Sequence, residues 1–190
     1  MKGIYCLEGI WHEDMREKSS VKPILELLQS NQGIGFIYRN CATTQELEYY
    51  VSKWVQRKYS KFRILYLAFH GERNKLLLGN KKSYSLDDLA KLLTGKCSNS
   101  IIIFGSCSTL ALRKNYLTKF LCETGALAIC GYQKDVDWIH STAFEMLILS
   151  QMQENEFSKR GITAIENKVN SLAQKFRNEL QFRMVTAKGL

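Results

Sequence analysis

The stretch IIIFGSCST (residues 101–109) is a run of apolar residues that ends at a glycine, a serine and a cysteine. A short apolar run bounded by turn-forming residues is typical of a buried β-strand. Earlier in the chain, YLAFHGE (66–72) ends a second apolar run at a histidine followed by a glycine. Two predicted strands therefore each end at a side chain capable of chemistry, His70 in one case and Cys107 in the other.

Predicted strands and helices alternate outward from these two runs. Unbroken apolar strands indicate a sheet covered on both faces, and their alternation with helices favours a mostly parallel sheet between two helical layers. We therefore expect a three-layer α/β fold with five or six strands in a single domain over residues 1–190, since no segment resembles a linker. Strands are expected over 3–9, 33–41, 62–69, 100–105 and 126–132, helices over 20–31, 43–59, 85–93, 109–125, 141–153 and 161–181, and a hairpin over 74–85 that turns at Gly79-Asn80.

Three of these helices begin at residues suited to capping a helix N-terminus. Thr43 with Glu46, and Ser85 with Asp88, have the spacing of a capping box, in which side chains satisfy the free N–H groups of the first turn. Ser20 is a further candidate N-cap. These signals predict where the helices begin.

Composition excludes a membrane-spanning chain and does not suggest a cofactor. Hydrophobic residues make up 45% of the 190 residues, which is enough for a core, yet no apolar run approaches the roughly 20 residues of a membrane helix. The start, MKGIYCLEG, has too short an apolar stretch for a signal peptide, so we expect a cytoplasmic protein that does not engage a membrane. The six cysteines form no CxxC pair and no zinc-ligand spacing, so we expect reduced thiols, no metal and no cofactor.

The net charge of +9 raises the question of an anionic partner. The charge is spread along the chain and is densest in 158–190, where it falls between apolar helix positions. No basic loop interleaved with aromatic residues is present. We therefore interpret the charge as a solvated basic face, which makes nucleic acid an unlikely partner, while an acidic partner or acidic protein substrate stays open.

The two strand ends predict a cysteine–histidine pair. Ligands gather at the carboxyl ends of parallel strands, and consecutive strands are usually neighbours about 4.8 Å apart. His70 and Cys107 would then emerge side by side, so that the imidazole takes the thiol proton and the thiolate attacks a carbonyl. The predicted helix after Cys107 would favour the thiolate further. The N–H of Gly71, with that of Cys107, is a candidate oxyanion hole.

Each of these residues also has an ordinary structural interpretation. A cysteine after a strand is commonly a small apolar filler, and a histidine at a strand end is commonly a hydrogen-bonded surface residue. His12 and His140 are weaker alternatives for a catalytic histidine, because neither precedes a glycine at a strand end. Serines flank Cys107, but there is no GxSxG motif of a serine hydrolase.

Carboxylates near the predicted strand ends are candidates for binding substrate. Asp135 and Asp137 follow the strand next to that of Cys107, where a carboxylate can pair with a lysine or arginine side chain of a substrate. The alternative interpretation of both is as ordinary loop acids. Glu8, at the end of the first strand, is a weaker candidate. Trp11 and Trp138 are candidates for the walls of a pocket or for the core.

YLAFHGE followed by IIIFGSCST resembles the caspase-like cysteine peptidases, and most closely their bacterial CHAT-domain branch, with its HG and (S/A)C motifs at successive strand ends. The order of predicted elements over about residues 3–153 is similar to that fold. The resemblance implies that His70 is the general base, Cys107 the nucleophile and Gly71 an oxyanion donor. The cysteine follows GS and not the QA of animal caspases, so the resemblance does not carry over specificity for aspartate.

The sequence thus predicts a cysteine endopeptidase that uses a Cys107–His70 dyad to cleave a protein or peptide after a basic residue. Two alternatives stay open. One is a catalytically silent interaction domain on the same fold, and the other is an α/β protein associated with nucleic acid through its positive charge.

Overall fold

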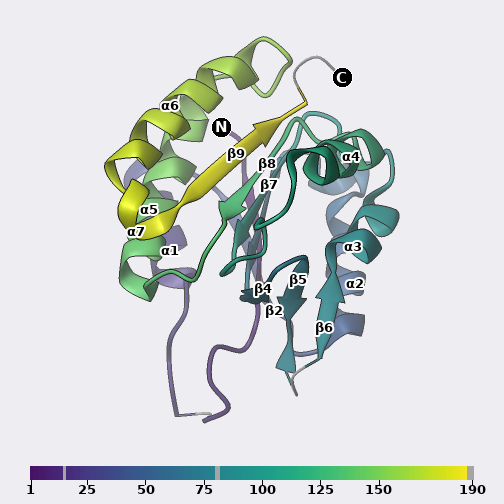
Figure 1. Ribbon diagram of the computed structural model, residues 1–190, viewed down its shortest axis with the longest axis vertical. Helices are drawn as coiled ribbons and strands as arrows, with labels where there is room; N and C mark the ends of the chain where they lie inside the picture. Colours follow the sequence, from purple (N-terminus) through teal and green to yellow (C-terminus); the bar gives the residue numbers. More distant parts are fainter. Residues whose placement is uncertain (15, 80–81, 188–190) are drawn as a thin grey trace.

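The computed structural model describes residues 1–14, 16–79 and 82–187 (Figure 1). Its centre is a six-stranded sheet in the order β2-β1-β3-β7-β8-β9, in which every pair is parallel except the last. The predicted three-layer, mostly parallel fold is therefore confirmed. The strands are β1 (Ile4–Glu8), β2 (Phe36–Asn40), β3 (Ile64–Ala68), β7 (Ile101–Gly105), β8 (Ala128–Tyr132) and β9 (Phe182–Thr186).

Helices cover both faces of this sheet, as Figure 1 shows. One layer contains α1 (Lys22–Gln32), α5 (Trp138–Gln151), α6 (Gly161–Lys175) and α7 (Arg177–Leu180), with the short turn η3 (Met152–Glu154). The other contains α2 (Thr44–Trp54), α3 (Leu86–Leu93) and α4 (Lys114–Thr124), with η1 (Arg57–Tyr59). A small antiparallel sheet consists of β4 (His70–Glu72), β5 (Lys75–Leu77) and β6 (Ser83–Ser85), which confirms the predicted hairpin.

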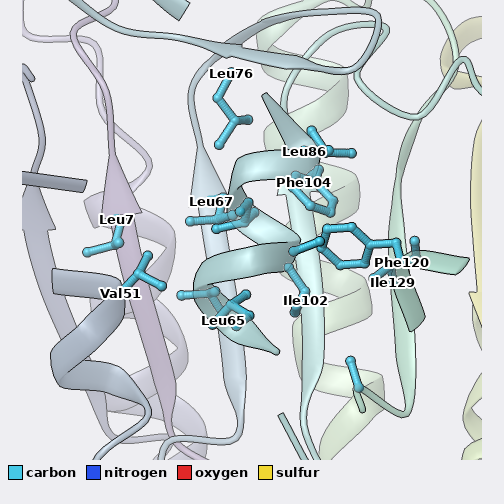
Figure 2. Close-up of a cluster of buried hydrophobic side chains, with 14 of the residues drawn as sticks. Leu7, Val51, Leu65, Leu67, Leu76, Leu86, Ile102, Phe104, Phe120 and Ile129 are labelled. Carbon is cyan, nitrogen blue, oxygen red and sulfur yellow. The ribbon is translucent and has the colours of Figure 1, made fainter. Parts of the chain in front are cut away.

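The core is divided between the two faces by the alternation of side chains along each strand. On β3, Leu65 and Leu67 belong to the cluster beneath α2, α3 and α4, which Figure 2 shows. Ile64 and Tyr66 belong to the opposite cluster, beneath α1, α5 and α6. Every residue of β3 is fully buried, because this strand lies in the middle of the sheet with helices above and below it.

Local signals set the ends of several helices. The hydroxyl of Thr43 accepts from the backbone N–H of Glu46, whose carboxylate accepts from the N–H of Thr43, so the predicted capping box is confirmed. Ser85 accepts from the N–H of Asp88 and caps α3. The N-cap of α1 is Val21, one residue after the predicted Ser20. The Ser20 hydroxyl accepts from the Lys22 N–H at 3.1 Å and donates to Glu8 at 2.6 Å.

Other predicted helix boundaries are also wrong. The helix predicted over 43–59 ends at Trp54, and residues 57–59 form the separate turn η1. Helix α4 begins at Lys114 and not at residue 109, because the N–H groups of Ser108 and Leu110 donate to the carbonyls of Lys134 and Tyr132, and the chain forms a turn there instead of a helix. Helix α5 begins at Trp138, earlier than predicted, because Asp137 caps it. The predicted helix over 161–181 breaks at Phe176 into α6 and α7.

The sixth strand, β9, has no counterpart among the predicted strands. It pairs antiparallel with β8 and packs on α6, so it is held by partners that are distant in sequence. The predicted turn at Gly79-Asn80 lies partly outside the described residues. Within the described residues, no helix has the length and apolarity needed to cross a membrane.

Candidate active site

The strands that carry His70 and Cys107 are neighbours, as predicted. Ala68 at the end of β3 is in register with Gly105 at the end of β7, and the N–H of Phe69 donates to the Gly105 carbonyl at 3.3 Å. His70 and Cys107 follow these ends directly and line the same cavity, which has a volume of about 400 Å³. The sheet therefore brings the imidazole and the thiol to one site.

The backbone around Cys107 is held from two sides. The Ser108 N–H donates to the Lys134 carbonyl at 3.0 Å, and its hydroxyl donates to Asp135 at 2.8 Å. On the other side, the Thr109 hydroxyl lies 3.3 Å from the Lys75 carbonyl in the small sheet. Ser108 adopts a positive φ of 54°, which a helix does not allow. This loop, residues 106–110, therefore presents Cys107 from a fixed, non-helical backbone.

Gly71 packs directly on this loop. A Cβ atom at Gly71 would lie 2.3 Å from Thr109 Oγ1 and 2.6 Å from the Cys107 carbonyl oxygen, which is closer than side chains approach each other. The glycine is thus required by the close contact of β4 with the 106–110 loop. The role of the Gly71 N–H as an oxyanion donor stays a prediction.

The His70 ring is oriented by Trp11. Its Nε2 lies 2.8 Å from the Trp11 carbonyl oxygen, which can only accept, so the proton resides on Nε2 and the lone pair of the neutral ring is on Nδ1. The Trp11 ring also contacts the imidazole edge-on, with centroids 5.1 Å apart, and it contacts Trp138 at 4.4 Å. Both tryptophans line the cavity, so they form its walls.

Cys107 is half-buried, and its Sγ lies 4.0 Å from the Val136 carbonyl oxygen, toward which the thiol donates. Burial raises the pKa of this thiol, and the negative charges of Asp135 and Glu145 raise it further. The expectation that a helix N-terminus favours the thiolate is wrong, since α4 begins at Lys114, seven residues later.

Glu145, which sequence reasoning missed, is the carboxyl group of the cavity. It comes from the middle of α5, is 3% exposed and lines the cavity with Cys107. Tyr66 donates a hydrogen bond to it, and a Cβ atom at Gly105 would lie 3.0 Å from its Oε1. Burial raises the pKa of Glu145 to about 7, against the opposing hydrogen bonds of the Tyr66 and Tyr132 hydroxyls. The feature of the sequence that could have identified Glu145 is a charged residue on the otherwise apolar face of α5.

Glu8 is fully buried and is occupied by the loop that follows β1. Its carboxylate accepts from the Trp11 indole N–H at 2.6 Å, from the Ser20 hydroxyl at 2.6 Å and from the Val21 N–H at 2.7 Å, and also from the Tyr38 hydroxyl. It is not one of the described residues that line the cavity. Glu8 therefore positions Trp11, whose carbonyl group orients His70.

Asp135 and Asp137 both have partners within the chain. Asp135 accepts from Ser108, and Asp137 caps α5 by accepting from the His140 N–H at 2.9 Å. Neither is among the described residues that line the cavity, so their role in binding substrate stays a prediction. His12 lines the cavity but is exposed, and the His140 ring lies 3.4 Å from Glu179 outside it.

Within the described residues, no three His, Cys, Asp or Glu side chains are placed to hold a metal ion together. The site therefore offers a thiol, an imidazole and a buried carboxyl group around one cavity. Its apolar walls include Phe69 and Tyr132.

The whole chain is similar in structure to caspase-1 from Spodoptera frugiperda. The TM-score is 0.57, the sequences are 12% identical, and the match covers 99% of this chain and 88% of that chain. At this identity the likeness concerns the fold alone, which is caspase-like, as the sequence motifs predict. The finer resemblance to the CHAT-domain branch stays a prediction.

The chain belongs to the family of unknown function DUF6642, whose model matches residues 1–185. No curated protein matches it in sequence.

Proposed function

We propose that this protein is a cysteine endopeptidase that uses Cys107 as the nucleophile and His70 as the general base. The observation that carries the proposal is the pairing of β3 with β7, after which His70 and Cys107 line one cavity. The caspase-like fold supports it independently. The substrate is a protein or peptide, because an extended chain has the shape to reach a nucleophile at the edge of a sheet.

The reaction begins with transfer of the Cys107 proton to Nδ1 of His70, the nitrogen left free by the bond between Nε2 and the Trp11 carbonyl oxygen. The thiolate then attacks the substrate carbonyl carbon, and the oxygen gains negative charge, which the N–H groups of Gly71 and Cys107 stabilise. The Trp11 carbonyl oxygen stabilises the imidazolium that forms, since it accepts from the protonated ring.

Collapse of the tetrahedral intermediate breaks the carbon–nitrogen bond, and His70 donates its proton to the leaving amine. This step leaves a thioester on Cys107. Water, deprotonated by His70, attacks the thioester, releases the acid product and restores the thiol. Because its pKa is raised, the Cys107 thiol keeps its proton in the free protein. Proton transfer to His70 then takes place within the complex, where substrate displaces water.

Glu145 supports the part of the proposal that concerns specificity, which is cleavage after a basic residue. The cavity has apolar walls for the methylene groups of a lysine or arginine side chain, and its lining includes the buried carboxyl group of Glu145 for the charged end. Asp135 and Asp137, the carboxylates predicted from sequence, lie outside the described lining. We therefore assign the charge preference to Glu145 first.

Reporter peptides test both parts of the proposal. Cys107→Ala and His70→Ala, each confirmed as folded by circular dichroism, are expected to lose cleavage of lysyl and arginyl peptides by about a thousandfold or more. Glu145→Gln is expected to lower kcat/KM for lysyl peptides relative to norleucyl peptides, with the exposed Glu156→Gln, outside the cavity, as the matched control. Undiminished cleavage by either dyad variant refutes the peptidase, whereas an unchanged lysyl preference in Glu145→Gln refutes only the specificity.

A second candidate, a catalytically silent interaction domain, is favoured by one observation. The Cys107 thiol donates toward the Val136 carbonyl, and burial raises its pKa. Alkylation distinguishes the two candidates, with the exposed Cys122 as the internal reference. Faster labelling of Cys107 than of Cys122 by a peptidyl-lysyl chloromethyl ketone at pH 7, reduced by His70→Ala, supports the peptidase, because the peptide brings the reagent into the cavity. Labelling of Cys107 no faster than that of Cys122 supports the silent domain.

A further inference from the structure

A second and larger cavity lies away from Cys107, along the edge strand β2, and has a volume of about 830 Å³. Four consecutive residues of β2, 36–39, line this groove, together with residues of α1, α2 and η1. We call it the β2 groove. Its described lining contains five tyrosines and no aspartate or glutamate, and its cations are Lys22, Arg39, Lys53 and Lys58.

Three of these cations have no carboxylate partner among the described residues. Lys22 pairs with Glu26 at 3.2 Å, whereas Arg39, Lys53 and Lys58 form no salt bridge within the described chain. Arg39 and Lys58 are exposed, and Lys53 is half-buried. The groove therefore carries uncompensated positive charge, which a carboxylate-bearing ligand would neutralise.

Strand β2 is an edge strand, and part of its backbone pairs with no other strand of the described residues. The Gly35 carbonyl accepts from the Ile4 N–H at 3.0 Å, and the Cys41 N–H donates to the Glu8 carbonyl at 2.8 Å, so odd-numbered residues face β1. Because alternate residues in a parallel pair direct their backbone groups to opposite edges, Phe36 and Tyr38 direct theirs to the open edge. The Tyr38 carbonyl accepts from the Arg39 guanidinium at 2.7 Å, an interaction that an incoming strand can replace.

The aromatic rings of the groove favour a peptide over a nucleic acid. Bases bind single-strand sites by stacking on open aromatic faces. Here the ammonium of Lys53 lies 4.9 Å from the ring centre of Tyr49, and that of Lys58 lies 4.8 Å from the ring centre of Tyr59. These two faces are covered by the protein's own lysines, which leaves the ammonium groups to bind carboxylates.

We propose that the β2 groove binds an extended, acidic segment of a partner protein, which adds to the free edge of β2 as a strand and places its carboxylates against Arg39, Lys53 and Lys58. Strand addition supplies main-chain hydrogen bonds, and the flanking cations select the acidic sequence. This site is separate from the Cys107 cavity, and the inference does not rest on the proposed peptidase activity.

Fluorescence anisotropy with a labelled peptide tests the proposal. The probe is Glu-Val-Glu-Thr-Glu-Val-Glu, and the controls are its lysine-for-glutamate counterpart and a copy with alternate backbone nitrogens methylated. We expect saturable binding of the probe alone, weakened as salt is raised. The double variant Lys53→Glu/Lys58→Glu is expected to weaken binding about tenfold or more, whereas the exposed Lys159→Glu, outside the groove, changes it less than about twofold.

Amide hydrogen exchange reports the backbone contact. Exchange at Phe36 and Tyr38 is expected to slow when the probe is added to the wild-type protein. Absence of probe binding overturns the proposal. The role of the cations would then be to prevent other chains from pairing with the exposed edge strand. Equal binding of the methylated copy overturns it as well. So does tighter binding of a twelve-nucleotide oligothymidylate, if Lys53→Glu/Lys58→Glu abolishes that binding and the oligonucleotide does not slow exchange at Phe36.

Discussion

Glu145 is a carboxyl group held in an almost fully buried position, and this makes the stability of the protein depend on pH. Burial raises its pKa from 4.5 to about 7. Between these pH values the folded protein keeps a proton on Glu145 that the unfolded chain releases. Stability therefore falls as pH rises through this window and is constant above it, with a total loss of about 3 kcal/mol from this group.

Comparison with Glu145→Gln isolates this contribution, because glutamine does not ionise. Urea unfolding of both proteins from pH 5 to pH 8 is expected to show a wild-type free energy of unfolding that declines relative to that of the variant. The difference levels off above pH 7. Parallel pH profiles would show that the Glu145 carboxyl titrates normally in the folded protein.

Gly71 has too little room around it for an added methyl group. Gly71→Ala is expected to destabilise the protein by roughly 1–3 kcal/mol and to displace the backbone of Cys107, because the new Cβ would overlap Thr109 and the Cys107 carbonyl. The matched control is Gly35→Ala, where a Cβ meets nothing within 4 Å. Thermal unfolding of both variants checks this. Equal melting temperatures would contradict the close contact.

At the scale of elements, Asp137 determines where α5 begins and so where Glu145 lies. Asp137→Ala is expected to cost about 1 kcal/mol, because it leaves the N–H of His140 without its cap, whereas Asp137→Asn keeps an acceptor and costs less. Chemical denaturation measures the cost. Should Asp137→Asn instead lower cleavage of lysyl peptides with stability unchanged, Asp137 binds substrate as the sequence predicts.

Elements differ in how far their boundaries follow from nearby residues. The start of α2 was predictable because Thr43 and Glu46 satisfy each other's backbone groups within one turn. The start of α4 was not, because Ser108 and the residues after it bond to the 132–135 segment and to the small sheet. Strand β9 likewise depends on β8 and α6, which its own five residues do not reveal.

At the scale of the whole molecule, stability depends on the two apolar layers that enclose the sheet. Leu67→Ala in the cluster of Figure 2 is expected to cost about 2–5 kcal/mol, because it leaves a cavity between β3 and the α2–α4 layer. The matched control is Leu27→Ala on α1, where the side chain is 50% exposed and the expected change is within about 0.5 kcal/mol. Urea unfolding of both variants measures these costs, and equal costs would contradict a tightly packed layer.

The sequence by itself determined the alternation of strands and helices and the two strand ends that carry His70 and Cys107, because apolar runs and turn residues act over a few positions. Only the tertiary structure decided which groups surround them. The Trp11 carbonyl that orients His70 lies 59 residues away in sequence, and Tyr66 meets Glu145 across 79 residues. Such partners are set by the packing of whole helices on the sheet, which no local pattern of residues encodes.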